Sequence, residues 1–224
     1  MTGGEAVIAP DGEGWRNRVL ERSLASAKQR SLDRSEVFIQ AAIELLQEKG
    51  EGFTLQEVSD RAGFSLRLFY QHFGGKHDLL LAVLEEELRT AVTQVQERIS
   101  VEPDPVRRLV ILLEMFLASA DVPSAHNLTL LKYELELLAT HPSGVAELHA
   151  PETRIAQAII ADGLATGAFH VASAEDGAYF VVALKRVYNQ SKLLGSTFGV
   201  ALPYPGEFIR FCVEGLGGSL PDEA

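Results

Sequence analysis

Residues 54–80 of this 224-residue chain read TLQEVSDRAGFSLRLFYQHFGGKHDLL, and their order predicts two short helices joined by a tight turn. Thr54 followed three residues later by Glu57 is typical of a capping box, in which both side chains satisfy free amides at a helix start. Gly63 should end this helix, because glycine enters the left-handed conformation at low cost. Ser65 can then cap a second short helix. The stretch therefore predicts a helix-turn-helix.

The flanking sequence is also helical in period. Apolar residues before the motif recur with the spacing of one buried helix face; they are Phe38, Ala41, Ala42, Leu45 and Leu46. Asp33 with Glu36 predicts the start of that helix. Further helices are expected over about 76–99, 106–120, 123–139, 143–167, 173–196 and 207–215, with an interruption at Pro151 left open. No useful stretch alternates between apolar and polar residues, so we predict an all-α fold.

The sequence divides into three parts. We expect residues 1–32 to be a disordered or partly helical basic extension, residues 33–78 a three-helix helix-turn-helix domain, and residues 79–224 a larger helical domain. Apolar residues make up 46% of the chain and charged residues 23%, which is ordinary for a soluble globular protein. The longest apolar run, over 79–84, is far short of the roughly 18 residues of a membrane span, so no membrane partner is expected. Cys212 is the single cysteine, which excludes an internal disulfide; with no secretory signal visible, we expect a cytoplasmic protein.

Charge is unevenly distributed along the chain. The net charge is −11, yet residues 15–76 hold ten Lys and Arg against eight Asp and Glu, a balance of +2. Residues 77–224 hold ten against twenty, a balance of −10. An acidic body with a mildly basic head suits a protein that meets a polyanion at one end only.

The helix-turn-helix resembles the DNA-binding head of the TetR family of transcriptional repressors. The family's positions are matched in register by Thr54, Ala62, Gly63, Ser65, Tyr70, His72, Phe73, Lys76 and Leu79. The match covers about residues 35–84, and the rest agrees only in architecture. Arg67 and Leu68 depart from the family pattern, which has Gly followed by Thr or Ala. The departure implies either a different base preference or a slightly rotated helix.

Physical chemistry and the resemblance together assign residues to DNA. A short helix on a rigid support can enter the major groove, and Arg67 can bind a guanine through two hydrogen bonds. The exposed candidates for bases are Leu66, Arg67, Leu68 and Gln71, on a helix capped by Ser65. The resemblance gives phosphate contacts to Thr54, Tyr70, His72 and Lys76, all of which are hydrogen-bond donors. Taken singly, Thr54 is a helix cap and His72 a structural histidine; the DNA assignment depends on the whole set.

Basic residues also precede the first helix. Arg22, Lys28, Arg30 and Arg34 lie there, and family members with N-terminal extensions suggest a DNA-binding arm that reaches along the backbone or into the minor groove. A solvated, disordered arm explains the same residues equally well.

For the body, the resemblance implies a ligand cavity and a dimer surface. Residues on the middle helices are the candidates for an apolar effector: Met115, Phe116, Leu131, Tyr133 and Glu134. Residues on the last two helices, which are apolar over more than one face, are the candidates for the dimer: Val181, Leu184, Tyr188, Phe208, Cys212 and Leu216. Ordinary core packing explains each ligand candidate at least as well.

These features predict a homodimeric repressor that binds a palindromic double-stranded operator and is released by a small-molecule effector. The alternatives are a helical small-molecule-binding protein without DNA recognition, and an enzyme that uses the body cavity. We expect neither a catalytic site nor a cofactor. A loose cluster could hold a metal, namely His141, Glu147, His149 and Glu152, but it lacks helical metal-ligand spacing, so we expect no metal.

Overall fold

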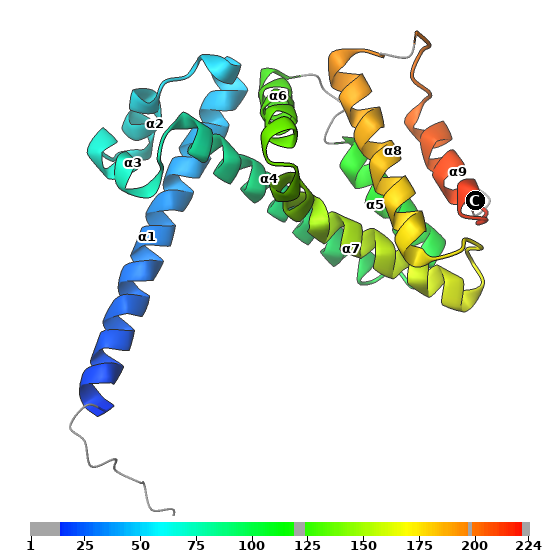
Figure 1. Cartoon of the computed structure of the whole chain (residues 1–224), viewed down its shortest axis with the longest axis horizontal. Helices are drawn as coiled ribbons and strands as arrows, with labels where there is room; N and C mark the ends of the chain where they lie inside the picture. Colours follow the sequence, from blue (N-terminus) through cyan, green and yellow to red (C-terminus); the bar gives the residue numbers. More distant parts are fainter. Residues whose placement is uncertain (1–13, 119–123, 197–198, 221–224) are drawn as a thin grey trace, which may run out of the picture.

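The computed structural model of the chain describes residues 14–118, 124–196 and 199–220. Within these ranges the fold is all-α, as predicted, and no strand is present. Figure 1 shows the elements, which are α1 (Gly14–Lys49), the 3-10 helix η1 (Gly50–Gly52), α2 (Leu55–Ala62), α3 (Leu66–His72), α4 (Lys76–Ile99), α5 (Pro105–Ala118), α6 (Ala125–Thr140), α7 (Pro142–Thr166), α8 (Ala174–Leu194) and α9 (Pro205–Gly215). Among the described helices, none is both long enough and apolar enough to cross a lipid bilayer.

The helix-turn-helix forms through local hydrogen bonds. The Thr54 hydroxyl accepts the Glu57 amide at 3.2 Å, and the Glu57 carboxylate accepts the Thr54 amide at 2.8 Å. Gly63, with a φ of 72°, ends α2 in the left-handed conformation. The Ser65 hydroxyl accepts the Leu68 amide at 3.2 Å and starts α3. The predicted capping box, turn and second cap are therefore confirmed.

An aromatic cluster packs α3 against α1. The Phe38 ring meets Phe69 and Phe73 edge-on, with centroids 5.4 and 6.2 Å away, and all three side chains are buried. Each buried phenylalanine contributes about 1.5–3 kcal/mol. The same core includes Leu130 and Tyr133 from α6, so the head packs directly against the body. The division of the chain at residue 78 stays a prediction.

The first helix is longer than expected. The chain is helical without interruption from Gly14 to Lys49, so the extension is not an irregular arm in its described part. The predicted helix start at Asp33 is wrong: Asp33 lies within α1, where its carboxylate accepts the Gln29 amide group at 2.8 Å. No Pro or Gly follows Gly14 in this segment, and strong helix formers extend the helix. The expected disorder of the first residues concerns residues 1–13, outside the described ranges.

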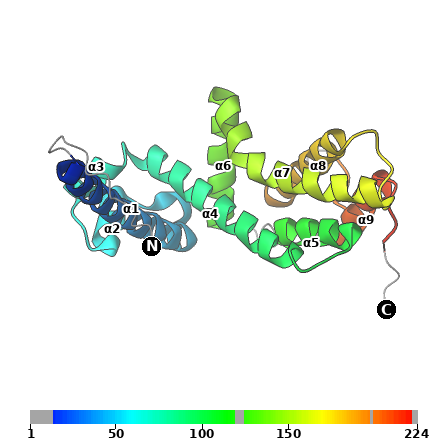
Figure 2. The same ribbon diagram turned by 90° about the horizontal axis from the view of Figure 1, so that it is seen from below.

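The helices of the body follow the predicted order. Helices α5, α7, α8 and α9 bury a second apolar core against the second half of α4. Pro151 lies inside α7 without ending it. Gly163 lies so close to Phe169 that a Cβ would stand 2.0 Å from the ring, so only glycine fits there. Figure 2 shows α8 and α9 at the end of the molecule opposite the head.

Two predicted helix ends, at residues 120 and 123, lie outside the residues that the structure describes. The helix expected over 106–120 is described as α5 up to Ala118, and the helix expected from residue 123 is described as α6 from Ala125, with Ser124 as its cap. Residues 119–123 lie outside the described ranges.

Candidate nucleic-acid interface

Helix α3 is presented by the rest of the head. Phe69 is its buried anchor, while Arg67, Tyr70 and Gln71 are exposed. Arg67 and Gln71 have no hydrogen-bond or ion-pair partner in the described part of the chain, so both side chains are free to meet a base edge. Helices α2 and α3 lie at the left-hand edge of the molecule in Figure 1, with the body on the other side. The helix can therefore approach a duplex without a clash with α4–α9.

Two of the four base-reading candidates are less exposed than predicted. Leu66 and Leu68 are half-buried and pack against the head core. A short helix on a core turns one side inward, and Phe69 cannot bury its ring without drawing these neighbours toward the core. Arg67 and Gln71 are therefore the two base-reading candidates on α3 whose side chains are exposed.

The predicted phosphate ligands differ in how free they are. Tyr70 is 56% exposed, and its hydroxyl is available. The Thr54 hydroxyl is already occupied, since it donates to the Glu57 carboxylate at 3.0 Å and accepts the Glu57 amide. A hydrogen bond from Lys49 and two from Thr54 lower the pKa of the Glu57 carboxyl to about 2. Thr54 therefore acts first as a cap.

His72 is held by a partner that the sequence did not suggest. Its Nδ1 lies 2.9 Å from the Ser35 hydroxyl on α1. Ser35 lies three residues before Phe38, on the same face of α1, and this spacing was the one signal that the sequence offered. The Ser35 hydroxyl also donates to the Ser31 carbonyl at 3.1 Å, so Nδ1 of His72 is the donor in this contact, which fixes the imidazole ring.

Lys76 is committed to the protein itself. Its ammonium donates to the carbonyls of Glu51 and Phe53 at 2.6 and 2.7 Å, and it lies 4.0 Å from the centroid of the Phe53 ring. Burial lowers the pKa of Lys76 below its usual value. These hydrogen bonds join the η1 segment to the start of α4, and they leave one N–H of the ammonium for another acceptor. The contact of Lys76 with a phosphate stays a prediction, and the structure adds a structural role for this side chain.

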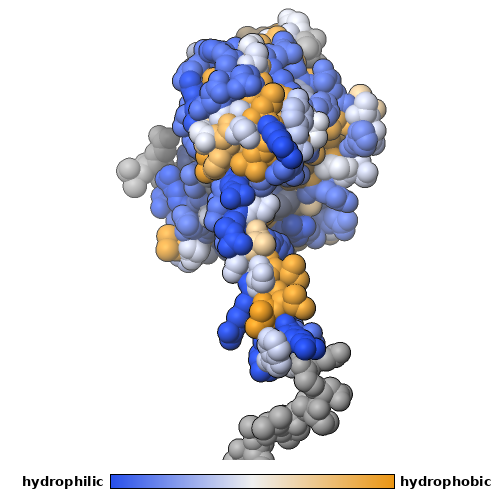
Figure 3. Space-filling model, turned by 90° about the vertical axis from the view of Figure 1, so that its left-hand side faces the viewer, coloured by the Kyte–Doolittle hydropathy of each residue, from blue (hydrophilic) through white to orange (hydrophobic). Residues whose placement is uncertain are grey.

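The arm residues lie on a rigid helix. Lys28, Arg30 and Arg34 are exposed on α1. Figure 3, which faces the head end, shows the N-terminal part of α1 extending away from the rest of the molecule with apolar side chains along one side. Trp15 and Leu24 are among the exposed apolar residues there.

Two hollows in the body contain most of the predicted ligand residues. The first, here called the α4–α7 groove, has a volume of about 1010 Å³ and is lined by segments of α4, α6 and α7 that include Tyr133. The second, here called the polar cleft, has a volume of about 200 Å³ and is lined by Phe116, Leu131 and Glu134. Met115 lines neither and packs against the body core.

A buried network of charges borders the polar cleft. Lys185 donates to Glu152 at 2.5 Å, His149 lies 2.9 Å from Glu134, and Arg186 also bonds Glu134. Burial opposes the charged form of His149, but its hydrogen bond to Glu134 and the nearby Glu152 carboxylate outweigh burial and raise its pKa. Burial likewise opposes ionised Glu134 and Glu152, yet the hydrogen bonds to His149 and the adjacent cations lower both pKa values. The charges pair with one another, but His149 Nδ1 and Glu152 Oε2, 3.7 Å apart, make no hydrogen bond among the described residues.

This network also accounts for half of the loose His/Glu cluster in the sequence. His149 and Glu152 belong to it, whereas His141 contacts Thr140 at 3.0 Å. In the residues described, no three His, Cys, Asp or Glu side chains are grouped so that they could hold a metal ion.

The dimer candidates are mostly internal. The structure buries Val181, Tyr188, Phe208, Cys212 and Leu216 within one chain, and only Leu184 is exposed. Burial raises the pKa of the Cys212 thiol to about 12, so the thiol stays protonated. The same two helices expose other apolar side chains, namely Tyr179, Phe180, Val187 and Phe211. Periodicity showed that α8 and α9 are apolar on more than one face, but not which face is covered by the chain itself.

Comparison with known proteins agrees with this head. Residues 38–83 match the sequence model of the family described as "Bacterial regulatory proteins, tetR family". The chain is 35% identical over 77 residues to the HTH-type transcriptional activator FasR of Mycolicibacterium smegmatis. That match covers 34% of this chain and 35% of FasR, so the chain spans about a third of that relative's length.

Solved structures extend the likeness in fold to the body. RolR in complex with resorcinol has a TM-score of 0.63 at 19% identity, covering 85% of this chain and 91% of RolR. The fatty acid degradation regulator FadR of Bacillus halodurans has a TM-score of 0.64 at 14% identity, covering 80% and 94%. FadR of Bacillus subtilis in complex with stearoyl-CoA has a TM-score of 0.59 at 14% identity, covering 80% and 98%. The helix-turn-helix is thus similar in sequence to that of the tetR family of bacterial regulatory proteins, and the helical body is similar in fold to solved transcriptional regulators.

Proposed function

We propose that this protein is a ligand-responsive transcriptional repressor that binds double-stranded DNA through α3. The observation that carries the proposal is a recognition helix at the free end of the molecule, whose Arg67 and Gln71 are exposed and have no partner in the described residues. A bidentate arginine contact to guanine gives about 1–3 kcal/mol of base discrimination. Such a regulator would act in the bacterial cytoplasm, where the chromosome lies.

The DNA-binding form is proposed to be a homodimer. An exposed apolar face on α8 and α9 supports it, formed by Phe180, Leu184, Val187 and Phe211. Large exposed apolar patches commonly mark protein interfaces. A two-fold dimer through this face places one head at each end, and the operator is then a palindrome with half-sites in successive major grooves.

A ligand in the body would act through α6. This helix touches the head, because its first residue, Ala125, packs against Gly50. The contact is so close that a Cβ added to Gly50 would lie 2.8 Å from the Cβ of Ala125. Further along, Tyr133 lines the α4–α7 groove and Glu134 lines the polar cleft. A ligand can release DNA only if it binds one head position more tightly than the other. Regulators of the same fold have been solved with resorcinol and with stearoyl-CoA, so the fold does not determine the effector.

Two finer points belong to the same proposal. The exposed Lys28, Arg30 and Arg34 of α1 would contact phosphates beside the α3 site. The body would bind its ligand without converting it, a role consistent with buried charges that pair with one another.

The test is selection of bound duplexes from random and genomic pools with the full chain, followed by titration of the selected duplex and transcription in vitro. We expect a palindromic site, lower transcription with the protein bound, and salt-dependent affinity. Activation of transcription, which FasR's name describes for that relative, would refute repression. Failure to select any duplex would favour a small-molecule-binding protein without DNA recognition.

A further inference from the structure

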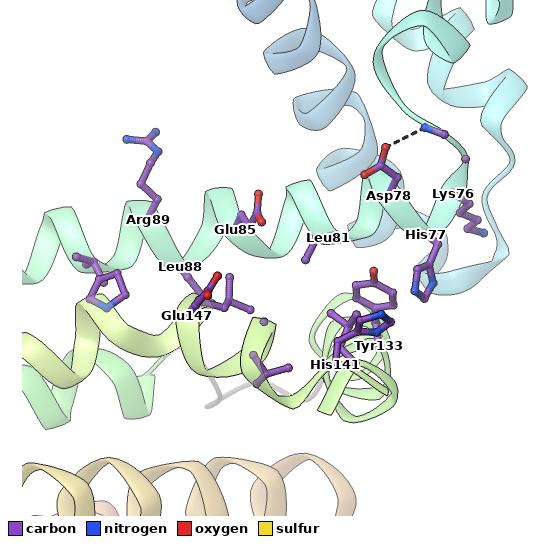
Figure 4. A pocket seen from close by; sticks show the side chains of 18 of the residues that line it. Lys76, His77, Asp78, Leu81, Glu85, Leu88, Arg89, Tyr133, His141 and Glu147 are labelled. Atoms are coloured by element: carbon purple, nitrogen blue, oxygen red, sulfur yellow. Dashed lines mark hydrogen bonds between the residues drawn. The ribbon is translucent and has the colours of Figure 1, made fainter. Parts of the chain in front are cut away.

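The α4–α7 groove lies at the junction of head and body. Residues 74–78, which join α3 to α4, line one end of it, and α6 and α7 line the opposite side. Figure 4 shows this arrangement, with Leu81 and Leu88 of α4 facing the side chains of α6 and α7. Its volume, about 1010 Å³, is that of a site for a drug-sized molecule. A ligand here would touch both parts of the protein.

Both cations that border the groove are engaged elsewhere. Lys76 donates to the η1 carbonyls, as described above. The Arg89 guanidinium donates to both carboxylate oxygens of Glu86 at 2.8 and 2.6 Å. In Figure 4 both side chains point away from α6 and α7. Neither cation is placed to neutralise a charge inside the groove.

The carboxylates of the groove are not neutralised. Glu85 and Glu147 have no hydrogen-bond or ion-pair partner in the described residues. Asp78 accepts only the backbone amide of Gly74, at 2.9 Å. Three exposed carboxylates therefore border a groove whose lining is mixed, with leucines beside polar residues such as His77, Gln96 and His141. Charge complementarity calls for a positively charged occupant.

A buried hydroxyl gives independent evidence for a ligand. Tyr133 is 4% exposed, and its hydroxyl finds no hydrogen-bond partner among the described residues. Burial, followed by the charges of Asp78, Glu136 and Glu85, raises its pKa to about 12. In Figure 4 the hydroxyl points toward α4, across the groove. Buried polar groups are nearly always paired with protein or water, so this hydroxyl is free to pair with a molecule bound in the groove.

We propose that the α4–α7 groove binds a hydrophobic monocation of the alkylammonium class. Its apolar part packs against Leu81, Leu88 and Leu137, and its charge lies between Glu85 and Glu147. The Tyr133 hydroxyl accepts a hydrogen bond from the ammonium, and the electron-rich ring favours a nearby cation. The polar cleft is a poorer candidate for a cation, because Lys185 and Arg186 already line it. The claim that this cation binds the groove is independent of the proposed function. The further claim that it is the effector that releases DNA rests on the proposed function.

The test is calorimetric titration of the full chain, without DNA, with three probes that share one alkyl chain: decylammonium, decanol and decanoate, each below its micellar concentration. We expect decylammonium to bind about tenfold more tightly than decanol, and decanoate to bind most weakly. E85Q and E147Q should each weaken decylammonium about threefold and leave decanol unchanged. Y133F should weaken decylammonium without altering the fold, and added salt should weaken it as well.

The matched control is E97Q, which removes an exposed carboxylate from α4 outside the groove and should leave all three affinities unchanged. Equal affinity for the three probes, tighter decanoate binding, or no effect of E85Q and E147Q would each overturn the proposal. A separate titration of the selected duplex distinguishes the two claims. Cation binding without any DNA binding would refute the proposed repressor and support the groove assignment. DNA binding without cation binding would refute the groove assignment and support DNA recognition.

Discussion

Arg67 and Lys76 were both expected to contact DNA, and the structure separates their roles. R67A should remove base choice at one position of each half-site, at a cost of about 1–3 kcal/mol on the preferred duplex and little on others, because Arg67 contacts nothing in the described chain. K76M should instead lower the free energy of unfolding by about 1–2 kcal/mol, because it strips two carbonyls of their donor. Titration of matched and mismatched duplexes tests the first, and urea denaturation tests the second. Uniform loss of DNA affinity in K76M with unchanged stability would show Lys76 to be a phosphate ligand rather than a structural residue.

The buried charges around His149 predict a pH dependence of stability. The pKa of His149 is raised in the fold, so its contribution is complete below the unfolded value of about 6.5 and is lost as pH rises through the folded value. The pKa values of Glu134 and Glu152 are lowered, so their contribution is present above about 4.3 and is lost as pH falls. Urea denaturation across pH should therefore show greatest stability at mildly acidic pH. H149Q should remove the decline on the alkaline side, H141Q at the exposed histidine should not, and a decline that persists in H149Q would contradict this origin.

At the scale of the element, α1 decides what the N-terminal arm can do. A continuous helix holds the three basic residues of the arm on defined faces: Arg30 and Arg34, four residues apart, share one face, whereas Lys28 lies on another. Replacing all three with Ala should reduce the slope of log affinity against log salt by about 0.9 for each phosphate that the arm neutralises. It should leave unfolding unchanged, because these side chains are exposed. The measurement is duplex affinity between low and physiological salt, and an unchanged slope would show that the arm does not reach DNA.

At the scale of the whole molecule, assembly depends on the outer face of α8 and α9. F180D and F211D should each favour the monomer, because a buried phenylalanine contributes about 1.5–3 kcal/mol and a charge placed there must be desolvated. Sedimentation of the full chain reports the oligomeric state, and the same variants should lose affinity for a palindrome more than for a half-site. V101D, at a residue 84% exposed outside these helices, is the control. A wild-type monomer, or a dimer unaffected by both substitutions, would place the interface elsewhere.

The sequence-based predictions were accurate for features that depend on neighbouring residues and less accurate for features that depend on contacts between distant segments. The caps at Thr54 and Ser65 and the turn at Gly63 could be predicted residue by residue, because each depends on atoms within a few positions. The prediction of a helix start at Asp33 was wrong, because an aspartate can either cap a helix or accept a hydrogen bond inside one. Here its carboxylate accepts the side-chain amide of Gln29, one turn earlier. The candidates for the dimer were chosen by period on α8 and α9, and the chain itself buries all of them except Leu184.

The sequence by itself determined that this chain is helical and where the helix-turn-helix begins and ends. It also determined that Arg67 is an exposed side chain of the second helix of this motif. These features follow from local hydrogen bonding and from the spacing of apolar residues. Only the tertiary structure decided that Lys76 clasps the η1 turn, that Ser35 holds His72, and that unpaired carboxylates meet a buried tyrosine beside α4. Those contacts join residues far apart in the chain, and periodicity along one helix carries no information about which other helix lies across from it.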